Sequence, residues 1–260
     1  MEEKKYKAPA VEKVLDILEL MSKENKSFSV TELSSRLGIP VNSVFRIMKE
    51  LELKSYIFKS SVDSTYQLTE KLYYLGSSIA NRITLKNVAQ EPMNRILELT
   101  RETVILTKFG KNHSTLIIDQ IESPEPIKFV STVGLEYPSH SSAMGKTMLA
   151  YLDDNEIDEF LNDNVLTKIT SNTITDPLEF KKELARVKEK GYAYDIEESC
   201  LGLKCIAAPI FNSKGKIEGS IGISGLAFRI SERVIEEYTL EVVKEARLVS
   251  EFLGYCGYDN

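Results

Sequence analysis

The chain has 260 residues, of which 28% are charged and 42% are hydrophobic, with 13 glycines and 8 prolines. These values exclude a disordered, collagen-like or low-complexity chain. No apolar run approaches the roughly 20 residues that span a bilayer, and no apolar signal segment follows the charged first residues. Three cysteines leave at least one unpaired, which favours reduced thiols. We therefore expect a cytoplasmic protein with no membrane segment.

The net charge of −6 is unevenly distributed along the chain. Residues 1–80 hold 12 basic and 11 acidic side chains, whereas residues 81–260 hold 21 and 28. The acidic excess therefore lies in the C-terminal part. This asymmetry indicates two modules with different tasks. The nearly neutral first module remains able to bind nucleic acid, because the potential of the contacting face matters more than the net charge.

Three short helices are predicted within the first 51 residues. Apolar residues recur at helical spacing over residues 11–21. Ser29 and Glu32 have the spacing of a capping box that opens a second helix, and Gly38 is placed to end it. Pro40 begins the third helix. Its inward face is expected to contain four apolar residues: Val41, Val44, Met48 and Leu51.

A two-stranded hairpin is predicted directly after these helices. Residues 56–58 and 65–68 are rich in strand formers, and the polar residues 59–64 lie between them. Three helices followed by a hairpin are typical of a winged helix-turn-helix domain. A linker helix is predicted next, marked by four apolar residues: Leu72, Leu75, Ile79 and Ile83.

The rest of the chain mixes strands and helices. Strands are predicted over residues 103–109, 115–121, 128–132, 204–211 and 217–224. Helices are predicted over residues 88–100, 142–151, 155–161, 177–190 and 231–252. The turn at 212–215 has the composition of a hairpin. This pattern predicts an α+β domain with an antiparallel core.

The outward face of the third helix carries residue types that bind DNA. In a helix-turn-helix the second helix of the motif enters the major groove, where Arg and Asn side chains contact base edges or phosphates. Asn42, Arg46 and Lys49 share one face, and Lys54 and Lys59 are placed to reach phosphates. The predicted DNA contacts are Thr31, Val41, Asn42, Ser43, Phe45, Arg46, Lys49 and Lys59. A small helical domain that binds protein is the alternative, and the hairpin favours DNA because it supplies the wing.

Four segments resemble the IclR family of bacterial transcription regulators. They are residues 29–51, residues 135–150 with a Ser-Ala-x-Gly-Lys pattern, residues 191–210 with Cys-Ile-Ala-Ala-Pro, and residues 221–225. The resemblance covers nearly the whole chain in the same order. It implies a GAF-like effector domain, a small organic effector that is often a carboxylic acid, and a homodimer or dimer-of-dimers.

The resemblance also implies an effector pocket. Its positions are Phe129, Tyr137, Ala143, Met144, Asp195, Leu203, Cys205, Gly222 and Ser224. Asp195 and Ser224 are expected to fix ligand hydroxyls, and the start of the helix near Ser142 offers backbone N–H groups to an anion. Met144 and Gly222 depart from the small and hydroxyl residues of some relatives. Ser55 replaces a glycine often found before the wing.

Metal and enzyme interpretations have weaker support, and we expect neither a metal nor a cofactor. Cys200, Cys205 and His140 match no common metal-site spacing. Ser142, His140 and Asp195 are the residue types of a nucleophilic triad, but no Gly-x-Ser-x-Gly elbow is present. We expect Cys205 to be a buried small apolar residue.

Three acidic and basic side chains near the pocket positions are expected to have structural roles. Glu197 and Glu198 are expected in ion pairs or helix caps. Lys146 is expected to reach a helix end or a neighbouring chain. Neither expectation involves acid–base chemistry.

The predicted fold class is α+β, with an N-terminal winged helix-turn-helix joined by a linker helix to a GAF-like domain. The domains are DNA-binding (1–70), linker (71–87), and effector-binding and oligomerisation (88–260). The predicted function is transcription regulation through a double-stranded DNA operator, controlled by a small organic acid. A constitutive DNA-binding protein and an enzyme using the GAF-like pocket are the alternatives.

Overall fold

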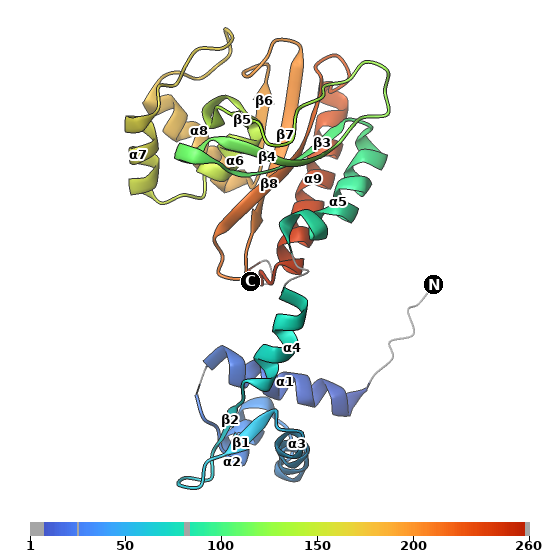
Figure 1. Cartoon of the computed structure of the whole chain (residues 1–260), viewed down its shortest axis with the longest axis vertical. Helices are drawn as coiled ribbons and strands as arrows, with labels where there is room; N and C mark the ends of the chain where they lie inside the picture. Colours follow the sequence, from blue (N-terminus) through green and yellow to red (C-terminus); the bar gives the residue numbers. More distant parts are fainter. Residues whose placement is uncertain (1–7, 25, 81–83, 258–260) are drawn as a thin grey trace. The chain divides into compact units, whose positions relative to one another are not determined.

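The computed structural model describes residues 8–24, 26–80 and 84–257. The chain divides into two compact units, Met1–Arg82 and Ile83–Asn260 (Figure 1). Each unit has buried apolar residues of its own. The predicted linker over 71–87 spans this division, and its limits remain predictions. No helix within the described ranges is long and apolar enough to cross a membrane.

The first unit has the predicted order of three helices and a hairpin. Its elements are α1 (Pro9–Glu24), α2 (Val30–Leu37), α3 (Val41–Leu53), β1 (Ile57–Lys59), β2 (Tyr66–Leu68) and α4 (Lys71–Ala80). One residue or more from each of the first five elements is buried in a common core, including Ile17, Leu33, Met48, Ile57 and Tyr66. The winged helix-turn-helix prediction is therefore confirmed.

Two local predictions in this unit are wrong in part. The Ser29 hydroxyl accepts the Glu32 N–H at 3.1 Å, but the Glu32 carboxylate accepts from Lys26 at 3.0 Å instead of completing the capping box. Val41 was expected to point inward, yet its side chain is 48% exposed. The buried stripe of α3 runs through Val44, Met48 and Leu51, and Val41 lies beside it in the first turn.

Two turns of this unit, one after α2 and one before the wing, contain a residue with a positive φ. Gly38 ends α2 in the left-handed region, as predicted. Ser55, before the wing, also adopts a positive φ of 58°, a conformation that favours glycine. The wing strands pair Ile57 with Leu68 and Lys59 with Tyr66.

The predicted linker helix corresponds to α4 over the residues that the structure describes. Leu72 is half-buried and Leu75 is exposed. Of the other two predicted apolar positions, the Ile79 side chain and Ile83 lie outside the described residues.

The second unit is built on a six-stranded antiparallel sheet in the order β5-β4-β3-β8-β7-β6. The strands are β3 (Thr103–Phe109), β4 (Thr115–Ile121), β5 (Glu136–Tyr137), β6 (Ala193–Ile196), β7 (Leu203–Phe211) and β8 (Ile217–Leu226). The hairpin turn between β7 and β8 is formed as predicted, with the Gly215 N–H donating to the Asn212 carbonyl at 2.9 Å.

Helices cover both faces of this sheet (Figure 1). On one face α5 (Leu85–Thr100) and α9 (Glu232–Phe252) pack side by side. The other face is covered by α6 (Ala143–Leu149), α7 (Asp154–Asp163) and α8 (Pro177–Lys190), with the short turns η1 (Lys111–His113) and η2 (Ser139–Ser141). The α+β class is therefore confirmed.

Three element predictions in this unit need correction. Residues 128–132 form no strand, because side chains bond part of their backbone. Thr103 donates to the Phe129 carbonyl, and the Gln120 amide bonds both backbone polar groups of Ser131. Helix α5 begins at Leu85 rather than 88, since the Thr84 hydroxyl caps it. Strands β5 and β6 are absent from the predicted elements.

Candidate DNA-binding face and effector cavity

Helix α3 presents most of the predicted DNA contacts to solvent. Asn42, Phe45, Arg46 and Lys49 are exposed, and Ser43 is half-buried. Val41 is also exposed, which contradicts its predicted place in the core but agrees with its place among the predicted DNA contacts. The structure thus brings the predicted side chains of α3 together on its outer surface, and Thr31 is exposed on α2.

The cations of this helix differ in their partners. Lys49 pairs with Glu52 at 2.8 Å, a hydrogen bond that raises the pKa of the lysine, and Lys54 pairs with Glu50 at 3.3 Å. Arg46 forms no ion pair with any residue that the structure describes. Its guanidinium is therefore the cation of α3 that is available to an anionic partner without breaking an existing pair.

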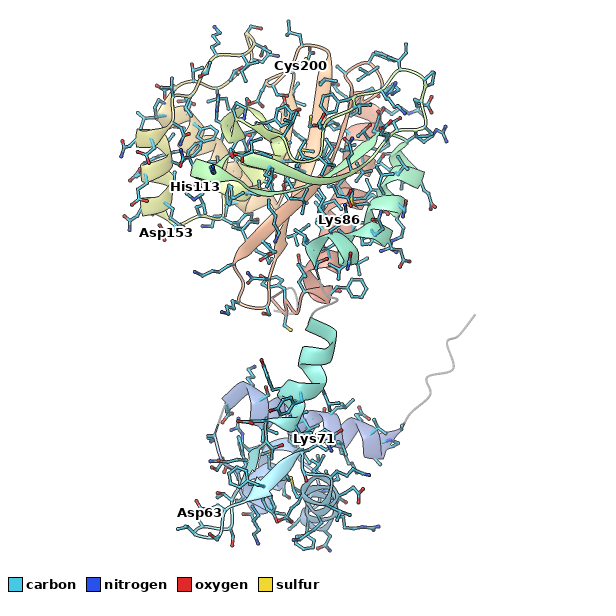
Figure 2. The ribbon with its side chains drawn as sticks, in the orientation of Figure 1. Asp63, Lys71, Lys86, His113, Asp153 and Cys200 are labelled. Carbon is cyan, nitrogen blue, oxygen red and sulfur yellow. The ribbon has the colours of Figure 1, made fainter. Side chains whose placement is uncertain are left out.

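The tip of the wing is held by its own hydrogen bonds. Asp63, labelled at the tip in Figure 2, accepts from the Thr65 N–H at 3.2 Å and the Thr65 hydroxyl at 2.7 Å. These bonds lower the pKa of the Asp63 carboxyl. Lys59, the last residue of β1 before the wing loop, has its Nζ atom 5.8 Å from the centre of the Tyr66 ring. Because Lys59 belongs to β1, its backbone is held in the hairpin from which the side chain is predicted to reach a phosphate.

A cavity of about 150 Å³ lies in the second unit, between the sheet and the start of α6. Seven of the nine predicted effector residues line it: Phe129, Tyr137, Met144, Asp195, Leu203, Cys205 and Ser224. They come from segments almost 100 residues apart in the sequence, so only the folded sheet brings them together. Cys200, which lies in the loop after β6 and is labelled in Figure 2, also lines the cavity.

Two predicted residues do not line the cavity. Ala143, the first residue of α6, is fully buried in the hydrophobic core. Gly222 lies within the sheet, and a Cβ atom built on it meets the Ile206 carbonyl oxygen at 2.1 Å. The close approach of neighbouring backbone accounts for glycine at this position.

Sequence reasoning missed several residues of the wall. Ile105 and Thr107 on β3, and Thr115 and Ile117 on β4, line the cavity together with Ser131, Ser141 and Ser199. The strand pairs are spaced by two residues, which places them on one face of the sheet. This alternation can be read from the sequence, but it does not show which face of the sheet borders a cavity.

Asp195 is completely buried and holds the loop beside the cavity. One carboxylate oxygen accepts from the N–H groups of Glu198 at 2.7 Å and Ser199 at 3.2 Å, and the other accepts from the Ser199 hydroxyl. Burial raises the pKa of this carboxyl despite these hydrogen bonds. Asp195 therefore links the cavity wall to the conformation of residues 197–200.

Two further polar residues of the lining, Cys205 and Ser224, contact each other. The Cys205 sulfur lies 3.1 Å from the Ser224 hydroxyl. Burial raises the pKa of the Cys205 thiol well above its ordinary value, so the neutral form is favoured. This agrees with the expectation of a buried, unreactive thiol.

A buried ion cluster lies next to this loop. Lys146 on α6 is fully buried and contacts Glu198 at 2.5 Å and Glu183 at 3.4 Å. The prediction that Lys146 reaches a helix end or another chain is wrong, and the ion-pair prediction for Glu198 is confirmed. Burial raises the pKa of Glu198, whose second carboxylate oxygen has no hydrogen-bond partner among the described residues.

The residue types of a nucleophilic triad are Ser142, His140 and Asp195, and each forms hydrogen bonds with other residues. The Ser142 hydroxyl accepts the Gly145 N–H at 3.0 Å as a helix cap, and His140 Nε2 lies 3.0 Å from the Thr167 carbonyl oxygen. Burial lowers the pKa of His140. A search of the described residues finds no group of three or more His, Cys, Asp or Glu side chains placed to hold a metal ion.

A winged helix-turn-helix in one unit and a cavity lined by predicted effector residues in the other are the features of a DNA-binding regulator. Two family models match the two parts: the IclR helix-turn-helix domain at residues 10–57 and the C-terminal domain of bacterial transcriptional regulator IclR at residues 77–251. The chain therefore belongs to the IclR family and is a DNA-binding transcriptional regulator.

Individual relatives are similar over the whole length. The chain is 32% identical to the HTH-type transcriptional regulator KdgR of Dickeya chrysanthemi over 249 residues, which are 96% of this chain and 81% of that protein. Identity to KdgR of Escherichia coli is 31% over 249 residues, covering 96% and 94% of the two chains.

Solved structures show the same architecture. The crystal structure of the Thermotoga maritima IclR matches with a TM-score of 0.64 at 32% identity, covering 94% of this chain and 98% of that one. The Agobacterium tumefaciens repressor BlcR matches with a TM-score of 0.81 at 22% identity, covering 96% and 98%, which is a likeness of fold.

Proposed function

We propose that this regulator binds a small organic acid in the cavity of the second unit and that the bound acid changes its affinity for operator DNA. The single observation that carries this proposal is the convergence of seven predicted effector residues on one cavity. The binding roles assigned to those residues, and to the DNA contacts on α3, are part of the proposal.

The size and chemistry of the cavity limit the ligand. A volume of about 150 Å³ holds a compound of roughly six to ten non-hydrogen atoms, since cavities of this size accept benzene. No lysine, arginine or histidine is present among the described residues of the lining. The carboxylate would therefore be held by serine and threonine hydroxyls and backbone N–H groups rather than by an ion pair.

The same lining supports a ligand that also carries hydroxyl groups. Asp195 and Ser224 lie on the wall as acceptors for such groups, while Phe129, Met144 and Leu203 supply apolar surface. A ligand hydroxyl that donates to Asp195 would compete with the N–H groups of Glu198 and Ser199 for the same oxygens. Binding would therefore alter the loop over residues 197–200.

We place the regulator in the cytoplasm as a homodimer or dimer-of-dimers. A single winged domain whose contacting helix offers one unpaired arginine binds weakly, so two half-sites about one helical turn apart are needed. A ligand then acts by its different affinity for two arrangements of the heads, with a coupling of roughly 5- to 150-fold in DNA affinity.

The test is DNA binding measured by gel shift with the sequence upstream of the protein's own gene and a panel of small hydroxy and keto acids. We expect binding at low salt and a change of at least about fivefold with one member of the panel. Absence of binding at low salt refutes the operator prediction for that sequence. Binding that is indifferent to every acid supports the constitutive alternative instead.

Two variants separate the two sites. Arg46→Ala should weaken DNA binding but keep ligand-induced thermal stabilisation, because Arg46 is exposed on α3 and belongs to the first unit. Leu203→Trp should fill the cavity and remove ligand stabilisation while DNA binding persists. Loss of both properties in either variant would indicate misfolding, which circular dichroism detects.

A further inference from the structure

Two large apolar side chains are exposed on the first two turns of α3. Val41 is 48% exposed and Phe45 is 49% exposed, and they lie one helical turn apart. Neither belongs to the hydrophobic core of the first unit, which uses Val44, Met48 and Leu51 of the same helix. The fold therefore gains little from these two side chains, and their apolar surface is available to a partner.

The surroundings of this pair indicate the chemistry of the partner. Asn42 and Arg46 are exposed beside it, and no acidic residue occurs in residues 41–48. Arg46 has no ion-pair partner among the described side chains. An anionic partner with a small apolar group near hydrogen-bonding edges complements such a surface.

The major groove of DNA offers this combination at thymine. Its C5-methyl is the apolar group that a base pair presents there, next to acceptors for arginine and asparagine. Residues at the start of the second helix of the motif contact base edges. We propose that Val41 and Phe45 read thymine methyl groups in each operator half-site, an inference that rests on α3 being the DNA-contacting helix.

The expected effect is modest and measurable. Burying one methyl group accounts for about a fourfold change in affinity. Replacing the contacted thymine by deoxyuridine removes only that methyl and leaves the hydrogen-bonding edges intact. The proposal thus predicts a loss of about fourfold for each contacted thymine, and unchanged binding for thymines outside the contacts.

The experiment uses full-length protein and duplexes that it enriches from a random-sequence pool. Each thymine of an enriched site is replaced in turn by deoxyuridine, and affinity is measured by fluorescence anisotropy at fixed salt. We expect one or two positions per half-site to show the loss. If no position responds, the proposal is wrong although DNA binding stands; if no duplex is enriched, the DNA-binding role of the face is wrong.

Variants assign the effect to the two side chains. Phe45→Ala should bind the thymine duplex about as weakly as wild type binds the deoxyuridine duplex, and should no longer distinguish the two. Phe45→Leu should restore part of the distinction. Leu53→Ala is the matched control, because Leu53 is a 79% exposed apolar residue at the other end of α3.

Two outcomes overturn the assignment. A Phe45→Ala variant that keeps the full response to methyl removal excludes Phe45 as the reader, and the same result for Val41→Ala excludes Val41. A variant that changes the oligomeric state in sedimentation, with unaltered affinity per dimer, shows that the pair contacts protein instead.

Discussion

The buried ion pair between Lys146 and Glu198 gives the sharpest stability prediction. Lys146 has no exposed surface, and its Nζ atom lies 2.5 Å from the Glu198 carboxylate. In Lys146→Met the carboxylate is left buried without its cation. Removing one partner of a buried pair costs about 3–5 kcal/mol. We expect the lower end of this range because Glu183, the second partner of Lys146, retains Arg186 at 2.5 Å.

The loss should depend on pH in a defined direction. Burial raises the pKa of Glu198, and Lys146 opposes this rise. Without the lysine the pKa rises further. A carboxyl whose pKa is raised in the folded state binds its proton more tightly there than in the unfolded chain. Its contribution to stability is therefore present below the unfolded pKa and is lost as the pH rises through the folded pKa. The deficit of Lys146→Met relative to wild type should be larger at pH 7.5 than at pH 5.

The assay is thermal and urea denaturation of the full chain at the two pH values. For a unit of this size a loss of about 3 kcal/mol lowers the melting temperature by roughly 6–12 °C. Lys182→Met is the control, because Lys182 forms an exposed pair with Glu179 and should change stability by less than about 0.5 kcal/mol. The double variant Lys146→Met/Glu198→Met should recover most of the loss. A deficit below about 1 kcal/mol, or one that grows at low pH, would refute the reasoning.

Three further variants test separate parts of the structure by denaturation. Gly222→Ala should lower the free energy of unfolding by about 3 kcal/mol, because the new Cβ meets the Ile206 carbonyl oxygen of β7 at 2.1 Å. A change in the free energy of unfolding within about 0.5 kcal/mol would contradict this close approach. Ser55→Gly should raise the free energy of unfolding by about 0.5 kcal/mol, because φ at this position is 58°. Ser55→Val should lower the free energy of unfolding. A valine variant more stable than the glycine variant would be inconsistent with a left-handed residue before the wing. Arg229→Gln should cost about 3 kcal/mol, because its guanidinium holds the buried Glu102 carboxylate at 2.5 and 2.6 Å. The exposed pair of Arg101 provides the control, and Arg101→Gln should cost less than about 1 kcal/mol.

The order of elements in the first unit could be predicted because its signals are local. Apolar spacing, the Ser29 cap and Gly38 act within a few residues of the helices that they define. The error at Val41 also has a local origin. Val41 lies three residues before Val44 and therefore fits the apolar pattern of the helix. Which apolar residues of α3 are buried depends on how the other elements pack against it.

The strand error at residues 128–132 has a different cause. Their composition favours a strand, but no neighbouring strand pairs with them, and the side chains of Thr103 and Gln120 satisfy the backbone instead. These bonds join residues that are 11 and 26 positions apart in the sequence, and no local pattern reports such pairs. Lys146 was misjudged for the same reason, since Glu183 and Glu198 reach it only through tertiary packing.

The sequence by itself determined the two-part organisation, the α+β class and most of the exposed residues of α3, because helical periodicity and the family's motifs lie within short segments. Only the tertiary structure decided which residues enclose the cavity. It placed Asp195 on the wall, excluded Ala143 and Gly222, and added the threonines of β3 and β4. The physical reason is that a cavity is made where elements fail to fill the space between them, and that depends on the packing of distant segments.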